Sequence, residues 1–342
     1  MKKYHQDLSF LSSFQSKLLM AALLGMGSFI VSWSPVIFPK IGFVLANFSF
    51  LPIFLSGFAL GIVGGTLSAG IFVVISGLMG GISVCVWSVF SMFLVLWMIK
   101  KSLLFREEKS SRFFYPEGRL LVSLIILFLI VLGAAVLLLK PLLLMHMPIF
   151  QGLTSPSTQE MILMSLKEYV KLDSLEEGIL FQVFSLLSNY GPALLLSSWI
   201  LTLFVNAIGA LLILKKWGNS LRPPFYIQDI ALPAWYPWLL IASALLIFIG
   251  GEVGFIGKNA SALVMLGFIF QGISVFHVLM ANIFEKDSSM PKIMLGFFYS
   301  LVILFPWILG ILAGLGILEQ FMHLRNRIIA RFHEYQKSRG NQ

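Results

Sequence analysis

Residues 41–99 contain no Asp, Glu, Lys, Arg or His. About 20 mostly apolar residues are enough for a helix to cross a bilayer, and within lipid the backbone polar groups must be satisfied by the spanning structure itself. An uncharged run of this length therefore predicts several helices in lipid. The rest of the chain agrees, because only 11% of all residues are charged, against about 25% in a soluble domain. The sequence predicts an all-α, polytopic helical membrane protein.

Apolar segments of spanning length recur between residues 18 and 316. The candidate spans are 18–38, 43–63, 64–81, 82–99, 120–139, 191–214, 236–256, 259–283 and 293–316. The second, third and fourth lie almost end to end, so we expect at least one of them to be short and either tilted or re-entrant. We predict eight or nine transmembrane helices in a single domain over 18–316, between an N-terminal segment, 1–17, and a basic amphipathic tail, 317–342.

Basic residues gather in loops 100–119 and 215–235 and in the tail. The positive-inside rule places these segments and the N-terminus on the cytoplasmic side of the membrane. The net charge of +9 is then expected to set the orientation of the chain in a lipid bilayer. We expect no nucleic-acid partner. Three spans between 215–235 and the tail would, however, put the tail outside. Either one span is not a crossing, or residues 290–320 form a pair of half-helices broken at Pro306.

Two segments outside the spans have amphipathic patterns. On the outer side we expect two short helices at about 155–188, because Ser157 with Glu160 and Ser174 with Glu177 match the capping-box pattern. They would lie on the membrane or cover a cavity as a lid. The tail has an apolar face with basic residues beside it, so it would rest on the anionic inner leaflet or dock on a cytoplasmic partner. The face is formed by Phe321, Leu324, Ile328, Phe332 and Tyr335, and the basic residues are Arg325, Arg327 and Arg331.

Small residues recur every four positions in the stretch "SGFALGIVGGTLSAG", at Gly57, Gly61, Gly65 and Ala69. Small residues let two helix backbones approach closely in lipid. The pattern predicts helix packing, inside the protein or against another chain, with a helix break near Gly64 and Gly65.

Polar side chains within the spans are the candidate site residues. In 259–283, at about 100° per residue, one half of the helix circumference carries five of them: Asn259, Gln271, Ser274, His277 and Asn282. Asn206, in "FVNAIGA", lies deep in another span. Because such groups are costly in lipid, they are expected to face the protein interior. Gln271, Ser274, His277, Asn259 and Asn206 would line a cavity for a small polar solute, or they would hydrogen-bond to neighbouring helices.

Signatures of enzymes are missing from the sequence. It contains no G-x-x-x-x-G-K-[ST], H-E-x-x-H or G-x-S-x-G motif, and Cys85 is its one cysteine. We therefore expect no catalytic residues, no metal site and no cofactor. Any ATP-driven work would need an ATPase in another chain.

Six segments carry a family resemblance when read in order: "LPIFLSGFALG", "YPEGRLL", "NAIGALLILKKWGNSLRPP", "LPAWYPWLL", "FQGISVFH" and "GLGILEQFMHLRNR". Together they resemble the bacterial membrane proteins grouped as domain of unknown function 2232, the YybS-like family. The N-terminal half of that family is distantly similar to the substrate-binding components of energy-coupling-factor transporters. The resemblance implies a solute-binding membrane fold but supplies no binding residues.

Two functions stay open at this point. The first is a solute-binding or uptake component, with a small polar solute and membrane or ATPase proteins as partners. The alternative is a non-catalytic membrane scaffold or assembly factor that acts through helix packing and its basic tail.

Overall fold

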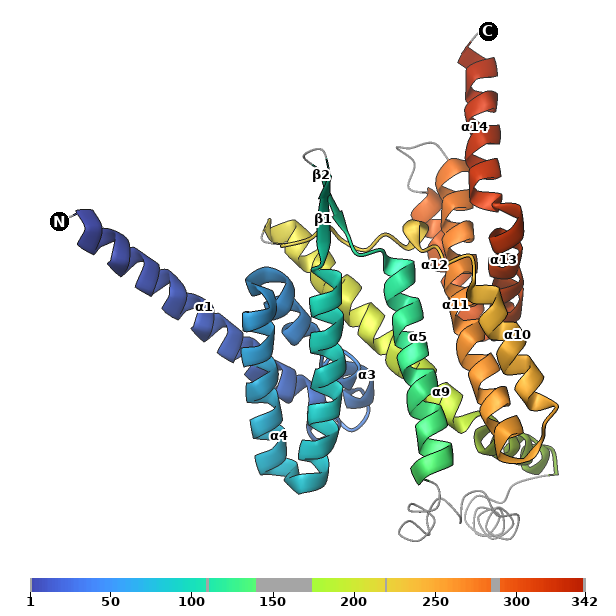
Figure 1. The fold of residues 1–342 in the computed structure, drawn as a ribbon, viewed down its shortest axis with the longest axis horizontal. Helices are drawn as coiled ribbons and strands as arrows, with labels where there is room; N and C mark the ends of the chain where they lie inside the picture. Colours follow the sequence, from blue (N-terminus) through green and yellow to red (C-terminus); the bar gives the residue numbers. More distant parts are fainter. Residues whose placement is uncertain (1, 109–110, 140–173, 219, 284–289, 341–342) are drawn as a thin grey trace. The chain divides into compact units, whose positions relative to one another are not determined.

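The computed structural model describes residues 2–108, 111–139, 174–218, 220–283 and 290–340 (Figure 1). These residues form helices and one small β-hairpin. The chain divides into two compact units. Unit 1 comprises Met1–Leu120 and Trp199–Asp229, and unit 2 comprises Leu121–Ser198 and Ile230–Gln342.

Unit 1 is built around one long helical stretch. Its elements, with the part of helix α9 that follows Ser198, are α1 (Lys2–Ser32), α2 (Ser34–Ile37), α3 (Gly42–Ala46), α4 (Leu51–Ser102), β1 (Phe105–Glu108), β2 (Ser111–Phe114) and the 3-10 turn η2 (Ile227–Asp229). The two strands pair antiparallel, with Phe105 opposite Phe114. Helix α1 packs on α4, where the Ser68 hydroxyl donates to the Ala21 carbonyl at 2.7 Å.

Helix α4 is broken twice, at Gly61 (φ 79°, ψ −173°) and Gly81 (φ 77°, ψ −171°). Both angles lie where glycine, lacking a Cβ, is favoured. The break at Gly81 coincides with the expected end of a span. The other break lies at Gly61 and not at Gly64 and Gly65, so the small residues do not form one continuous stripe. Gly57 and Gly65 instead pack inside the unit, where an added Cβ would lie 2.5 Å and 3.5 Å from Cδ1 of Ile99.

Unit 2 is organised around helix α11. Its elements are most of α5 (Glu117–Ala134), the π-helical turn η1 (Ala135–Leu139), the first part of α9 (Ser174–Trp217), α10 (Tyr236–Ile247), α11 (Gly251–Ile283), α12 (Met290–Leu304), α13 (Ile308–Met322) and α14 (Leu324–Gly340). The backbones of α11 and α13 touch, because a Cβ at Gly272 would overlap the Leu312 carbonyl and one at Gly316 would overlap the Phe268 carbonyl. Small residues thus bring two helices together, as expected in a membrane bundle.

The segment 290–320, on which the side of the tail depends, contains helices α12 and α13. They are bent by 119° at the short break between them. Each has 15 residues, about 22 Å of helix, which is less than the roughly 30 Å hydrocarbon core. Arg325, at the start of α14, donates to the Ile230 carbonyl at 3.2 Å, so the tail and the loop before α10 lie at the same end of unit 2. The structure thus has a bent pair of short helices in this segment, which fits either a broken span or a re-entrant loop.

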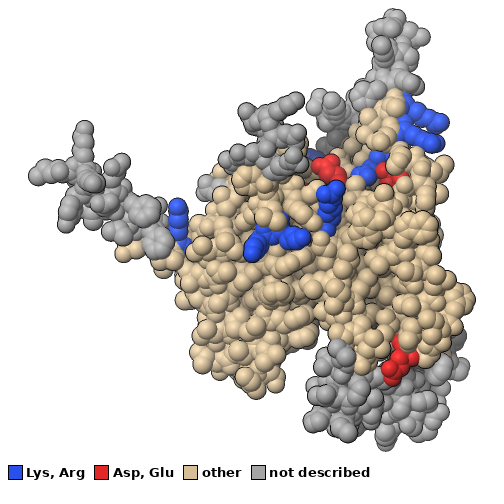
Figure 2. All heavy atoms as spheres, in the orientation of Figure 1, with Lys and Arg blue, Asp and Glu red and all other residues tan. Residues whose placement is uncertain are grey.

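Among the described residues, five helical stretches are long and apolar enough to cross a membrane, or six if the bent pair counts as one span. The expected eight or nine spans are not confirmed. One reason is that 42–102, expected to hold three spans, is one helical stretch by this criterion. Another is that α10 has only 12 residues. In unit 2, charged side chains collect at the two ends of the bundle in this view and leave an uncharged band between them (Figure 2).

Some sequence expectations meet the structure only in part. Residues 155–173 of the expected outer-side helices lie outside the described residues, and residues from Ser174 onward belong to α9 and not to a separate short helix. Toward the C-terminus, the helix break falls at His323, a left-handed residue (φ 49°), and not at 317. The tail helix is therefore α14.

Candidate functional site

Asn206 lies in unit 1, apart from the other four predicted site residues, which belong to unit 2. Its side chain is fully buried, and its amide nitrogen donates to the carbonyls of Asn47 and Thr202, each at 2.7 Å. These bonds tie α9 to the end of α3. The hydrogen bonds of the Asn206 amide nitrogen are thus helix-packing contacts. Its Oδ1 has no partner among the described residues.

Asn259 bridges two helices. Its amide nitrogen donates to the Asn189 carbonyl at 2.9 Å, and its Oδ1 accepts from the Ala193 backbone N–H at 3.0 Å. In a regular helix, the N–H of residue 193 would bond to the carbonyl of residue 189. The neighbouring Pro192 lies inside α9, where a proline disturbs this ladder. Asn259 therefore supplies both partners that the α9 backbone needs at its proline.

His277 is also occupied by a neighbouring helix. A ring nitrogen of His277 lies 2.7 Å from the Tyr299 hydroxyl of α12. Beside it, the rings of Phe276 and Phe298 stack with their centroids 3.8 Å apart. These contacts attach α12 to α11, so His277 does not join Gln271 in a common cavity.

Gln271 lies in a directed chain of hydrogen bonds. The Gln320 amide nitrogen donates to the Pro233 carbonyl at 2.8 Å. The Gln320 carbonyl oxygen accepts from the Gln271 amide nitrogen at 3.1 Å. The Gln271 side-chain oxygen, Oε1, then has no hydrogen-bond partner in the described part of the chain, although Gln271 is only 2% exposed.

Arg325 connects the same helices by a second set of hydrogen bonds. Its backbone N–H donates to Oε2 of Glu319 at 3.0 Å and its Nε to Oε1 at 2.7 Å. Its Nη1 reaches the Ser274 hydroxyl at 3.1 Å and the Ile230 carbonyl at 3.2 Å. One side chain thus joins α11, α13, α14 and the loop before α10. We call Gln271, Ser274, Glu319, Gln320 and Arg325 the Arg325 cluster.

A cavity of about 210 Å³ adjoins this cluster. It is bordered by Gln271, Glu319, Gln320, His323 and Arg325, and by the loop residues Ala231, Leu232 and Ala234. Two of the five predicted site residues, Gln271 and Ser274, therefore belong to the cluster, and Gln271 itself borders the cavity. The cavity is thus bordered by a residue whose buried amide oxygen has no partner among the described residues.

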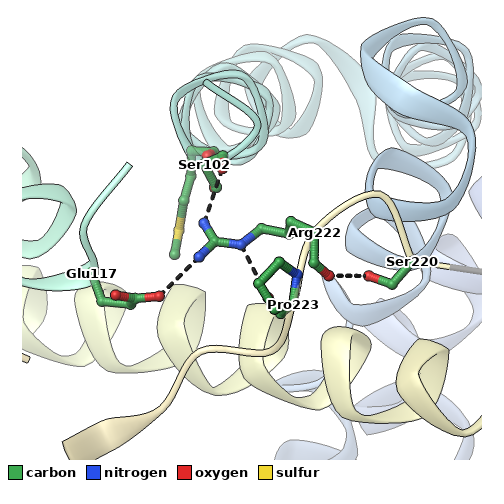
Figure 3. A network of polar contacts seen from close by, with 6 residues as sticks. Ser102, Glu117, Ser220, Arg222 and Pro223 are labelled. Carbon is green, nitrogen blue, oxygen red and sulfur yellow. Dashed lines mark hydrogen bonds and ion pairs between the residues drawn. The ribbon is translucent and has the colours of Figure 1, made fainter. Parts of the chain in front are cut away.

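Unit 1 contains a second polar cluster, around Arg222 (Figure 3). Its guanidinium donates to Glu117 at 2.8 Å and to the Ser102 carbonyl at 2.9 Å. The rings of Phe225 and Phe114 lie 4.2 Å and 5.4 Å from the guanidinium carbon. Burial lowers the pKa of Arg222 to about 10, while the Glu117 carboxylate acts to raise it, so Arg222 is charged at neutral pH. This Arg222 cluster fastens the loop after α9 to the end of α4 and the start of α5.

Sequence reasoning missed Glu319, Gln320 and Arg222 as site residues and assigned Arg325 to the surface of the tail. A signal was present in the segments that carry the family resemblance. Glu117 of "YPEGRLL" meets Arg222 of "NSLRPP". The segments "LPAW", "FQGIS" and "EQFMHLR" meet in the Arg325 cluster.

Comparison with known proteins identifies a family. The family described as "Predicted membrane protein (DUF2232)" matches residues 28–319, which confirms the resemblance to that family. The match includes the Arg222 cluster and, from the Arg325 cluster, Gln271, Ser274 and Glu319. No curated protein and no solved structure matches the chain. Among the described residues, no three His, Cys, Asp or Glu side chains are grouped so that they could hold a metal ion.

Proposed function

Because the chain belongs to the DUF2232 family of predicted membrane proteins, we propose that it is a solute-binding component of the bacterial inner membrane, with its site in the cavity beside Gln271. The basic tail and the loop before α10, which lie at one end of unit 2, then face the cytoplasm by the positive-inside rule. The distant resemblance to substrate-binding components of energy-coupling-factor transporters supports the same class of function. A role in uptake would require an ATPase from another chain.

The observation that carries this proposal is the unpaired Oε1 of Gln271 next to a cavity. A buried acceptor without a donor costs about 1–3 kcal/mol, and native proteins leave few of them. A bound solute that donates a hydrogen bond would remove this cost. Solute binding thus gives Gln271 a role that its contacts within the protein do not.

The proposed site differs from the one expected from sequence. It keeps Gln271 and Ser274 and adds Glu319, Gln320 and Arg325. Asn259 and His277 are bonded to α9 and α12, and Asn206 lies in unit 1. We therefore assign these three residues to helix packing.

Thermal unfolding of the purified chain, measured against a panel of vitamins, nucleosides and metal ions, tests the proposal. At least one compound should raise the unfolding temperature of the wild type. The double variant Gln271→Met with Gln320→Met should lose this increase, because Gln271→Met alone would leave Oε1 of Gln320 as a free acceptor at the cavity. Asn282→Ala should keep it, because Asn282 lies on the same helix and, among the described residues, its amide nitrogen donates to the Val278 carbonyl of that helix. A panel without any stabilising compound, or equal stabilisation of the double variant, would remove the solute-binding function.

A second candidate function, a membrane scaffold, is favoured by the direction of α14. Helix α14 continues beyond α13 in nearly the same direction (Figure 1). A helix directed along the bundle axis cannot lie flat on the bilayer that the bundle crosses. Arg327 and Arg331 are exposed on it, so the tail suits a partner protein with an acidic surface better than it suits the leaflet.

Charge reversal in the tail tests the scaffold function. Arg327→Glu together with Arg331→Glu should abolish association with a stoichiometric partner recovered from the native membrane, while solute-induced stabilisation is unchanged. The scaffold function fails if the wild type recovers no such partner or if the reversed tail retains it.

A further inference from the structure

We propose that the cavity beside Gln271 selects small uncharged solutes that donate a hydrogen bond through a hydroxyl or an amide N–H. This inference rests on the proposed solute-binding function and adds the chemical class of the solute. It follows from the direction of the hydrogen bonds, the balance of charge and the size of the cavity.

The direction of the hydrogen bonds is fixed from one end of the chain. The Pro233 carbonyl can only accept, so the group of Gln320 that lies 2.8 Å from it must be the amide nitrogen. The other end of the Gln320 amide is therefore its oxygen, which requires the nitrogen of Gln271 at 3.1 Å. The free atom of Gln271 must then be the oxygen, which can only accept. A solute that satisfies it has to donate.

The balance of charge argues for an uncharged solute. Both carboxylate oxygens of Glu319, a residue 5% exposed, accept hydrogen bonds from Arg325. The two opposite charges at the cavity thus compensate each other. A charged solute would meet no free counter-charge from this pair and would lose part of its hydration on entry, which is unfavourable. The remaining ionisable residue of the lining, His323, is exposed to solvent.

The volume limits the size of the solute. At about 210 Å³, the cavity is smaller than the roughly 300–1,000 Å³ of sites for drug-sized ligands. A solute with a small ring or a short chain fits this space. Sites that hydrogen-bond a donor group of their ligand discriminate strongly against an analogue that lacks it, so the class can be tested with isosteric pairs.

The probes are 2-pyrrolidinone and γ-butyrolactone, which have nearly the same shape but differ in the N–H donor, and pyrrolidinium and butyrate, which are charged. Their dissociation constants for the full chain in lipid nanodiscs can be compared by saturation-transfer NMR. We expect 2-pyrrolidinone to bind at least tenfold more tightly than the other three. The double variant Gln271→Met with Gln320→Met removes both amide oxygens, because Gln271→Met alone would free Oε1 of Gln320. It should reduce 2-pyrrolidinone to the level of γ-butyrolactone, and Asn282→Ala should leave its affinity unchanged.

Each opposite result overturns this inference. Equal binding of γ-butyrolactone would show that the free acceptor does not select donors. Tighter binding of pyrrolidinium or butyrate would show that the cavity selects charge, while leaving solute binding itself in place. Failure of 2-pyrrolidinone to bind also overturns the inference, and the compound panel then decides separately whether the cavity binds any solute. Because the comparison of probes uses the wild type, it does not depend on the folding of a variant.

Discussion

Arg222 in unit 1 and Arg325 in unit 2 make similar contacts in different surroundings. Each guanidinium binds a carboxylate and the carbonyl of a distant segment. The Arg222 side chain is 2% exposed and is packed by two aromatic rings. The Arg325 side chain is 16% exposed and borders a cavity with an unpaired amide oxygen nearby. The Arg222 ion pair is therefore closely packed, whereas the Arg325 ion pair borders a cavity.

This difference separates a structural cluster from a binding site. A buried ion pair needs further hydrogen bonds and good packing to offset the loss of hydration, and the Arg222 cluster supplies both. The Arg325 cluster satisfies its charged groups but leaves a neutral acceptor at the cavity. We infer that the uncharged residues of the Arg325 cluster bind the solute. The ion pair of Arg325 and Glu319 holds the surrounding segments in place.

The largest expected effect is at Arg222. Replacing it with Met leaves the Glu117 carboxylate without its partner, and removal of one member of a buried pair costs about 3–5 kcal/mol. Arg222→Lys should recover only part of this, because an ammonium cannot make the same fork of hydrogen bonds. Denaturant unfolding of the purified chain measures both. Stability within 1 kcal/mol of the wild type for Arg222→Met, on the order of an exposed pair, would show that the cluster does not hold unit 1 together.

The effect at Arg325 should be smaller, because water can reach this side chain. Arg325→Met should lower the free energy of unfolding by about 1.5–3 kcal/mol, the range for hydrogen bonds to charged groups. It should also leave the Glu319 carboxylate uncompensated, so the cavity should gain affinity for pyrrolidinium relative to 2-pyrrolidinone. NMR titration of the two probes checks this, and an unchanged affinity ratio would contradict the role given to the ion pair.

The smallest expected effect on stability is at Gln271. Gln271→Met removes one unpaired acceptor but leaves Oε1 of Gln320 without its donor, so the free energy of unfolding should fall by about 1 kcal/mol, the net contribution of the lost hydrogen bond. Asn259→Leu is the matched comparison on the same helix. It should cost about 1–3 kcal/mol, because it leaves the Ala193 N–H and the Asn189 carbonyl without their partner. An equal loss in the two variants would indicate that Gln271 is a packing residue like Asn259.

The sequence predicted the polar half of α11 because helical periodicity reports the angle of each side chain. It could not predict the partners, since angle says nothing about height along the helix. Asn259 and Gln271 are twelve residues apart, about 18 Å of helix, and so meet different neighbours. The partners Pro233, Gln320 and Arg325 come from segments far along the chain, and no local pattern pairs them with Gln271 or Ser274.

The helix breaks show a similar limit. Pro306 indicated the half-helix pair because proline lacks the N–H that continues a helix. In "GIVGGTLSAG" several glycines could have adopted a left-handed angle, and only the packing of α4 decides that Gly61 does so. The local sequence thus marked the region of the break but not the residue.

An experimental structure in lipid, at a resolution that shows ordered water, tests the difference between the two clusters most directly. We expect density that does not belong to the protein within about 2.7–3.2 Å of Oε1 of Gln271, and none at the guanidinium of Arg222. Oε1 of Gln271 bonded to an N–H or O–H of the protein itself, with the cavity closed, would contradict the account.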